Sequence, residues 1–143
     1  MLKELFGMKG KNILIVSCVF PPEPVVSANL SFDIANELAL KNNVTVISPF
    51  PTRPYGSNYR NHITQNHPFI HKIITSYTSP KSNLIGRMQE SFSLGRASSK
   101  FLHSKKNSID IIYANTWPIF AQYLLVKTAK KLNIPVILHI QDV

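Results

Sequence analysis

Short apolar runs alternate along the chain with longer amphipathic segments. The runs at residues 12–17 (NILIVS), 44–48 (VTVIS), 109–114 (IDIIYA) and 135–142 (PVILHIQD) are rich in β-branched residues and predict strands. Most of their successive positions are apolar instead of alternating with polar ones, which is typical of strands buried on both faces of a parallel sheet. A less regular segment at residues 69–77 predicts one further strand.

Segments with helical periodicity connect these strands. The first is predicted to begin at a cap on Ser27 or Asn29 and to run to about residue 41, with apolar residues at every fourth position from Leu30. Two more helices are expected at residues 82–106 and 118–132, and the second of these starts with a proline. Strands and helices in this order predict an α/β fold with a doubly wound, mostly parallel, Rossmann-like sheet.

The end of the chain bears on its domain organisation. Residues 1–143 suffice for one ordinary domain, but the sequence stops at Val143, directly after the last predicted strand. Sheets of this type usually close with another helix. The sequence therefore predicts a single N-terminal domain that is incomplete at its C-terminus. Apolar sheet surface left at that end predicts pairing of two copies into a homodimer.

Basic residues outnumber acidic ones. Sixteen lysines and arginines stand against seven aspartates and glutamates, which gives a formal net charge of +9. This balance favours an anionic partner, such as a phosphorylated substrate, an acidic membrane surface or nucleic acid. The sequence holds no recognition-helix or RNA-binding motif, so no nucleic acid partner is expected. A basic surface without a dedicated partner is the alternative.

Neither a signal peptide nor a membrane span is expected from the sequence. The first twelve residues are mostly polar and charged, and no apolar stretch approaches the roughly 20 residues of a span. The prediction is a cytoplasmic protein whose native start is Met1 or Met8. Basic and apolar residues share segment 82–106, which predicts weak peripheral contact with an anionic membrane surface. In the alternative, the apolar stripe of this segment packs on the sheet.

The loop after the first strand is the first place to look for chemistry. In open parallel sheets, ligands bind beyond the carboxyl ends of the strands. The loop from Cys18 to Ser27 leads into a helix N-terminus, which suits a phosphate or carboxylate; an ordinary helix start is the alternative. The loop contains no glycine, which argues against dinucleotide and Walker-type phosphate sites.

Metal chemistry is not expected. The chain has no Asp-x-Asp pair, and His62, His67 and His71 lack the helical spacing of a zinc hydrolase. These histidines are predicted to be solvated loop residues, and His139 is predicted to pack in the sheet. No cofactor and no metal ligand set is predicted.

Four segments, in the right order, resemble the N-terminal domain of GT-B glycosyltransferases of family 4. The segment 12–28 (NILIVSCVFPPEPVVSA) resembles the opening of these enzymes, which is a strand, then F-P-P-x-x-G-G, then a helix. The other three are 44–56 (VTVISPFPTRPYG), 110–118 (DIIYANTWP) and 134–143 (IPVILHIQDV). Together they are most similar to bacterial transferases that build surface polysaccharide, of the fucosamine-transferase type.

The resemblance implies a reaction. It implies retaining, metal-independent transfer of a sugar from a nucleotide-diphosphate donor, such as a UDP- or GDP-sugar, to a glycan or polyprenyl-linked acceptor in surface polysaccharide synthesis. The donor would be held mainly by a second domain that lies outside residues 1–143, and the first domain would bind the acceptor. The chain by itself is then expected to be inactive.

Site residues follow from the resemblance and from the rule for parallel strands. Gln141 and Asp142, which end the last strand, are the candidate catalytic residues; in the alternative, Asp142 caps the next turn. The candidate substrate-binding residues are Pro22, Glu23, Ser27, Asn29, Tyr55, Thr116 and Trp117.

One departure from the family pattern keeps a second interpretation open. Val25 and Val26 stand where the family has two glycines, so the backbone has less access to a diphosphate. The alternative function is a non-catalytic α/β anion-binding module with a basic face.

Overall fold

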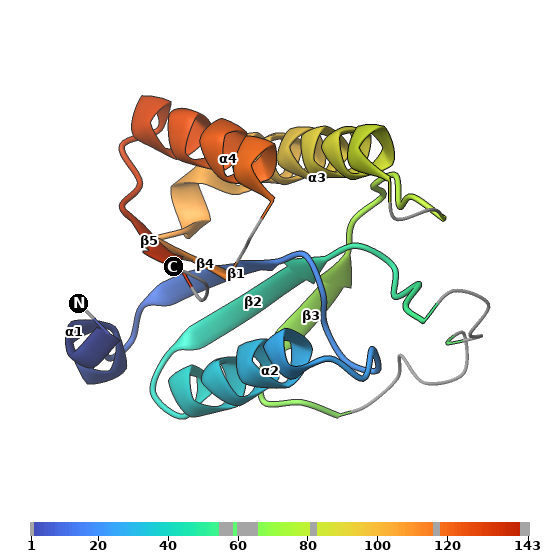
Figure 1. Cartoon of the computed structure of the whole chain (residues 1–143). Coiled ribbons are helices and arrows are strands. Elements are labelled where there is room, and N and C mark those ends of the chain that lie inside the picture. Colours follow the sequence, from blue (N-terminus) through green and yellow to red (C-terminus); the bar gives the residue numbers. More distant parts are fainter. Residues whose placement is uncertain (1, 55–58, 60–65, 81–82, 116–117, 141–143) are drawn as a thin grey trace.

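The computed structural model describes residues 2–54, 59, 66–80, 83–115 and 118–140 (Figure 1). The elements in chain order are α1 (Leu2–Gly7), β1 (Asn12–Ser17), α2 (Val26–Ala39), β2 (Asn43–Ser48), β3 (Ile70–Ile73), α3 (Leu84–Lys105), a 3₁₀ turn η1 (Lys106–Ser108), β4 (Ile111–Asn115), α4 (Ile119–Lys131) and β5 (Val136–His139). The strands predicted from apolar runs are all present, and the helices predicted between them are confirmed.

The five strands form one sheet in the order β3-β2-β1-β4-β5, and every neighbouring pair is parallel. The predicted doubly wound, Rossmann-like sheet is therefore confirmed. From β1 the chain adds strands first on one side and later, through β4, on the other. The strand order thus reverses between β1 and β4, which is where open parallel sheets place their ligand sites.

Helices cover both faces of the sheet (Figure 1). The helices α1 and α2 lie on one face, and α3 and α4 lie on the other. In β1, Ile13 and Ile15 point toward α2, whereas Leu14 and Val16 point toward α3 and α4; all four are at most 2% exposed. Burial of a side chain of this size contributes about 1.5–3 kcal/mol, so β1 anchors both layers.

Two details differ from the sequence-based prediction. The helix α2 begins after Val25, whose side chain makes no capping hydrogen bond, so the predicted caps at Ser27 and Asn29 are wrong. Both residues lie inside the helix. The short helix α1 was not predicted, yet its Leu5 is completely buried in the core on the α2 face.

The helices α3 and α4 approach each other closely. A Cβ atom on Gly95 would lie 2.8 Å from Leu124 Cδ1 and 3.0 Å from Ala121 Cα, so only glycine allows this spacing. Next to it, the backbone N–H of Ala121 donates to Ser91 Oγ at 3.0 Å. The helix backbones therefore come close together at Gly95 and Ala121, and the Leu124 side chain packs over Gly95.

Candidate functional site

The carboxyl ends of β1 and β4 are tied together and to α2 by buried polar groups. Ser17 and Asn115 end these strands side by side. The Asn115 side-chain amide donates to Ser31 Oγ at 2.6 Å and to the Ser27 carbonyl at 3.2 Å. Ser17 Oγ lies 2.9 Å from Ser31 Oγ. All three side chains are at most 4% exposed, so the reversal point of the sheet is held by a closed polar network.

The hydroxyl groups of Ser17 and Ser31 have fewer protons than hydrogen-bond contacts. Ser17 Oγ reaches the Val19 carbonyl at 2.6 Å, and Ser31 Oγ reaches the Ser27 carbonyl at 2.9 Å, in addition to their mutual contact. Two hydroxyl protons cannot serve three contacts at once, so one of the three lacks a hydroxyl proton. The Asn115 amide supplies the further donor that keeps Ser31 and the first turn of α2 in place.

A buried carboxylate links the loop after β1 to the loop after β2. Glu23 is 5% exposed, and its Oε1 accepts from the backbone N–H groups of Thr52 at 2.8 Å and Arg53 at 2.9 Å. Burial raises the pKa of Glu23, and these two hydrogen bonds and the Arg53 charge act in the opposite direction. The two loops at the carboxyl edge are therefore fixed relative to each other.

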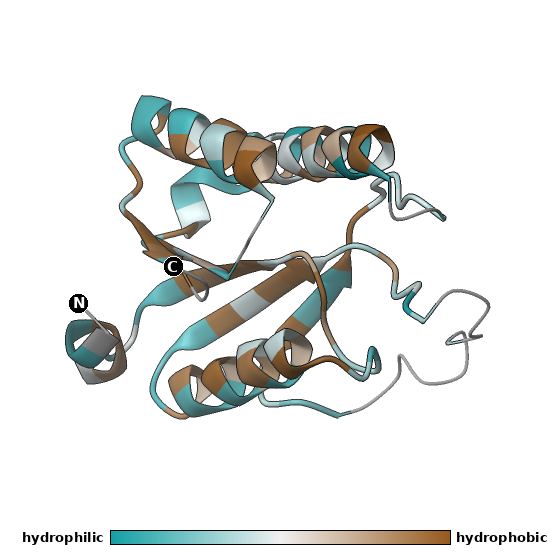
Figure 2. Cartoon of the chain, in the orientation of Figure 1, coloured by the Kyte–Doolittle hydropathy of each residue, from teal (hydrophilic) through white to brown (hydrophobic). Residues whose placement is uncertain are grey.

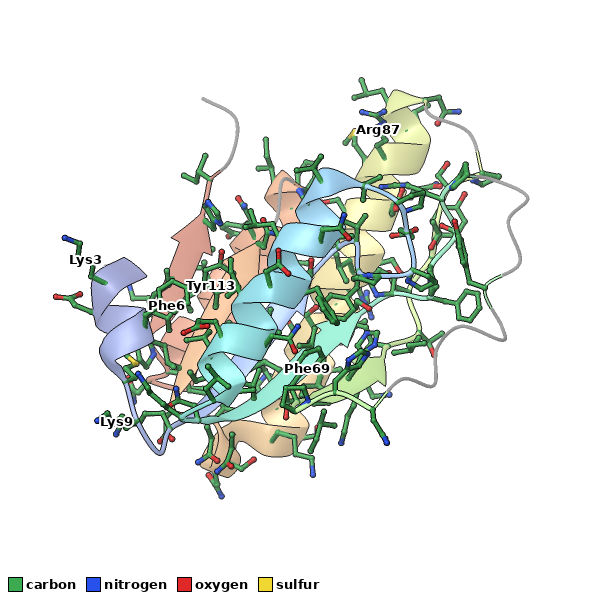
Figure 3. All side chains as sticks on the ribbon, turned by 90° about the horizontal axis from the view of Figure 1, so that it is seen from below. Lys3, Phe6, Lys9, Phe69, Arg87 and Tyr113 are labelled. Atoms are coloured by element: carbon green, nitrogen blue, oxygen red, sulfur yellow. The ribbon has the colours of Figure 1, made fainter. Side chains whose placement is uncertain are left out.

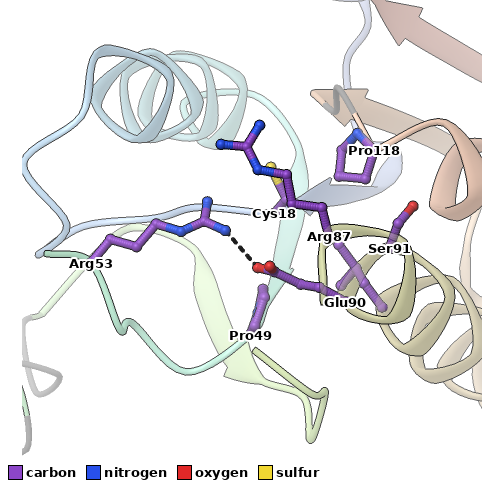
Figure 4. Close-up of a pocket in the computed structure, with 8 residues that line it drawn as sticks. Cys18, Pro49, Arg53, Arg87, Glu90, Ser91 and Pro118 are labelled. Atoms are coloured by element: carbon purple, nitrogen blue, oxygen red, sulfur yellow. Dashed lines mark hydrogen bonds and ion pairs between the residues drawn. The ribbon is translucent and has the colours of Figure 1, made fainter. Parts of the chain in front are cut away.

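A small pocket opens beside these loops (Figure 4). The Arg53 guanidinium donates to Glu90 Oε1 on α3 at 2.7 Å, and Arg87 comes from the first turn of the same helix. The free space is about 10 Å³, room for one water molecule. Its remaining walls are Cys18, Pro49, Ser91, Leu94 and Pro118. Two guanidinium groups and one carboxylate thus line one small pocket at the carboxyl edge.

The candidate substrate-binding residues fall into two groups. Pro22, Glu23, Ser27 and Asn29 surround the start of α2: Pro22 and Ser27 are half-buried and Asn29 is exposed. Since Oε1 of Glu23 is held by backbone groups, this residue has a structural role, and its contact with substrate stays a prediction. The other candidates, Tyr55, Thr116, Trp117, Gln141 and Asp142, lie outside the described residues.

Sequence reasoning missed the charged residues of the pocket. Arg53 is 37 positions away from Glu90, and none of the three residues was among the predicted site residues. One signal was available: Arg87 and Glu90 are three residues apart near a helix start, on the side that faces the carboxyl edge. Figure 3 shows Arg87 at the end of the molecule opposite Lys9, which precedes β1.

The prediction of solvated histidines is wrong for the two that are described. His71 lies in β3, its Nε2 is 2.8 Å from Ser48 Oγ, and its ring centre is 4.5 Å from that of Phe20. Burial, with a smaller effect of the nearby His67, lowers the pKa of His71 to about 4. His67 stacks on Phe69 at 4.9 Å between ring centres. These contacts place both rings in an aromatic cluster on the α2 face, where Figure 3 shows Phe69.

His139 packs in the sheet, as predicted. It ends β5, and its Nδ1 is hydrogen-bonded to the hydroxyl of the buried Tyr113 in β4. Burial raises the pKa of Tyr113 to about 12. Within the described ranges, no three His, Cys, Asp or Glu side chains are grouped so as to hold a metal ion. In the same part of the chain, no helix has both the length and the apolar character needed to cross a bilayer.

Comparison with known proteins gives similarity at the level of the fold. No family model matches the sequence, and no curated protein matches it. Among solved structures, the fold is similar to UGT2 of Phytolacca americana, a GT-B glycosyltransferase complexed with UDP-2-fluoro-glucose and pterostilbene. The TM-score is 0.62 at 15% identity, over 92% of this chain and 30% of that one. The chain thus spans under a third of that enzyme's length.

A second similar structure is the C-terminal domain of a hydrogenase from Pyrococcus furiosus. The TM-score is 0.58 at 13% identity, and the match covers 93% of this chain and 94% of that domain. At these identities both matches concern the fold alone. The fold is similar to the Rossmann-like half of a GT-B glycosyltransferase, and the comparisons do not reach family 4 or a particular branch of it.

Proposed function

We propose that this chain is the acceptor-side half of a two-domain glycosyltransferase, which moves a sugar from a nucleotide-diphosphate donor to a glycan or polyprenyl-linked acceptor. The observation that carries the proposal is the pocket at the carboxyl edge, where Arg53, Arg87 and Glu90 meet beside the reversal point of the sheet. The similar fold of a GT-B enzyme supports it. In this proposal the transfer is retaining and needs no metal, as the resemblance to family 4 implies.

The residues at the carboxyl edge would have different roles in the reaction. Negative charge develops on the departing diphosphate during glycosyl transfer, and preorganised donors stabilise it. The Arg87 and Arg53 guanidinium groups would supply positive charge to a phosphorylated acceptor or to that diphosphate. Glu90 holds Arg53 in place. Gln141 and Asp142 follow the end of β5 by two and three residues, and the chain leaves β5 at this same edge, so they remain our candidates for the reacting centre.

The chain alone should bind a nucleotide sugar weakly. One helix N-terminus contributes about 1–2 kcal/mol to anion binding. Micromolar affinity requires about 8 kcal/mol, so the second domain must supply most of the donor contacts. Calorimetry with UDP- and GDP-sugars is therefore expected to give no tight binding to residues 1–143. Tight binding, or transfer by this chain alone, would contradict the assignment of the acceptor side.

The decisive experiment uses the protein that joins this chain to its donor domain. Arg87→Ala and Asp142→Ala are expected to lower kcat/KM at least about tenfold with little change in Tm, because their effect is on charge in the cleft. Lys41→Ala, which removes an exposed lysine outside the pocket, is the control and should keep full activity. Equal kinetics of the Arg87→Ala and Lys41→Ala proteins would reject the proposed site.

A second candidate function has its own support. The similar hydrogenase domain is matched over 94% of its length, so a domain of this extent also exists outside glycosyltransferases. With its basic charge, this chain would then be a non-catalytic α/β anion-binding module. That function predicts anion binding by residues 1–143 that Arg87→Ala abolishes, and no sugar transfer in any longer form of the protein.

A further inference from the structure

The helices α3 and α4 expose large apolar side chains on the side away from the sheet. We call this surface the outer patch; its main residues are Leu84, Ile85, Met88, Phe92, Phe120 and Tyr123. Each of them is between 41% and 75% exposed. Met88, Phe92 and Phe120 also line an open groove of about 570 Å³ between the two helices. Exposed apolar surface that is gathered in one place marks an interaction site more often than isolated side chains do.

The close contact between the two helices lies beside these side chains. In it, Gly95 of α3 lies against Ala121 and Leu124 of α4. Met88 and Phe92 are seven and three residues before Gly95, so they lie near the side of α3 that faces α4, where Phe120 lines the same groove. The patch is therefore shared by both helices.

Positive charge continues the patch along both helices. After Phe92, the outward positions of α3 are Arg96 and Lys100, and after Tyr123 the corresponding position of α4 is Lys127, whose Nζ lies 5.5 Å from the Tyr123 ring centre. The two helices carry seven lysines and arginines, four in α3 and three in α4, and all are exposed. Their single carboxylate, Glu90, is bound to Arg53.

The arrangement is graded from apolar to basic, as Figure 2 shows for α4, whose first turn is hydrophobic and whose last turn is hydrophilic. We propose that the outer patch docks on the surface of an anionic lipid bilayer. The apolar side chains enter the interface, and Arg96, Lys100 and Lys127 lie against the headgroups. This inference does not depend on the proposed glycosyltransferase function.

Electrostatics favours a bilayer over a second copy of the chain as the partner of this surface. If two copies paired through the patch, Arg96, Lys100 and Lys127 of each copy would be brought together, and the repulsion between them would oppose pairing. An anionic bilayer neutralises the same charges and accepts the apolar side chains in one step. An anionic bilayer therefore matches both the apolar and the basic residues of this surface.

Vesicle co-sedimentation tests the proposal. Vesicles of phosphatidylglycerol and phosphatidylcholine in equal parts should bind the chain at low salt, and vesicles of phosphatidylcholine alone should bind it at least about tenfold more weakly. High salt should weaken the binding, because it screens the charges. The double variant Phe92→Ser/Phe120→Ser should bind the anionic vesicles at least about tenfold more weakly than the unmodified chain.

Matched variants on the other face are the controls. Leu40→Ser removes a side chain that is 68% exposed at the end of α2, and it should leave vesicle binding unchanged. Arg96→Glu/Lys100→Glu should reduce binding more than Lys9→Glu/Lys41→Glu, which makes the same change of net charge at two exposed lysines outside α3 and α4. Thermal melts check that each variant is folded.

Three results would overturn the proposal. The first is no binding to anionic vesicles at low salt. The second is equal binding of the unmodified chain and Phe92→Ser/Phe120→Ser. The third is a dimer in light scattering that this double variant converts to monomer while vesicles do not bind, because the patch would then join two copies of the chain.

Discussion

On one face of the sheet, α2 turns Asn29, Asp33 and Glu37 to the solvent, and its sequence contains no lysine or arginine. On the other face, α3 and α4 expose seven basic side chains and an apolar patch. Both layers bury similar aliphatic side chains against the same strands. The two layers therefore differ in their exposed surfaces. Packing of the core does not explain the exposed residues of α3 and α4.

The two layers also differ in how they are attached. The helix α2 is held by a polar network at its first turn and by aromatic rings at β3, among them Phe20, Phe32 and Phe69. The helices α3 and α4 pack on the sheet through aliphatic side chains and approach each other closely at Gly95, Ala121 and Leu124. The first layer should be sensitive to loss of polar groups and to pH, and the second to added volume.

The largest expected effect is on the helix pair. Gly95→Leu places a side chain where even a Cβ atom meets Ala121 Cα at 3.0 Å, so the helices must separate. Overpacking of this kind costs about 3 kcal/mol of unfolding free energy. Urea unfolding measures it, with Gly7→Leu as control, because a Cβ at Gly7 has no neighbour within 4 Å. Equal losses in both variants would show that the close approach of α3 and α4 is not needed.

Acid is expected to weaken the α2 face. The pKa of His71 is about 4 in the folded chain and about 6.5 when it is unfolded, so the unfolded chain binds more protons between these values. The unfolding free energy therefore has its full value above pH 6.5. It falls as the pH drops toward 4, by on the order of 2 kcal/mol. Unfolding measured from pH 7 to pH 4 tests this.

Two histidine variants separate this effect from general acid sensitivity. His71→Gln keeps a hydrogen-bonding group near Ser48 and removes the titration, so its unfolding free energy should change less with pH. His103→Gln, at an exposed position of α3, should keep the slope of the unmodified chain. If both variants showed that same slope, His71 would not be the group responsible.

The smallest expected effect compares two buried serines, one in each layer. Ser31 in α2 is hydrogen-bonded to Asn115 and Ser17, whereas Ser98 Oγ in α3 is buried with no hydrogen-bond partner. Ser31→Ala should lower the unfolding free energy by about 1 kcal/mol, because the Asn115 amide loses an acceptor. Ser98→Ala should leave it unchanged or raise it slightly, since no hydrogen bond is lost. A greater loss for Ser98→Ala would reverse the comparison.

The strands and the long helices could be predicted from the order of apolar residues. A strand buried on both faces is a continuous apolar run, and a helix buried on one side has apolar residues at helical spacing. The run from Asn12 to Ser17 is the clearest case. The helix α1 left no such mark, since six residues are too few for a period, and its Leu5 is recognised only by what it contacts. Val25 caps α2 through its backbone alone, so residue type did not mark that helix start.

The site could be predicted only in its location. The rule for parallel strands indicated the carboxyl edge, and the resemblance indicated Glu23 within it. The partners of Glu23 are backbone groups about 30 positions away, and the pair of Arg53 and Glu90 joins a loop to a helix. Contacts between segments so distant in sequence depend on the tertiary structure, which neither periodicity nor a local motif reports.

The Glu23 carboxylate has a consequence for the entropy of binding. By holding the backbone of Thr52 and Arg53, it orders part of the edge before any ligand arrives. Fixing the backbone of one residue costs roughly 1–2 kcal/mol, so a ligand that had to order these two residues itself would lose roughly 2–4 kcal/mol of binding free energy. Folding has already met this cost, so a ligand at the carboxyl edge finds the guanidinium of Arg53 carried on an ordered backbone.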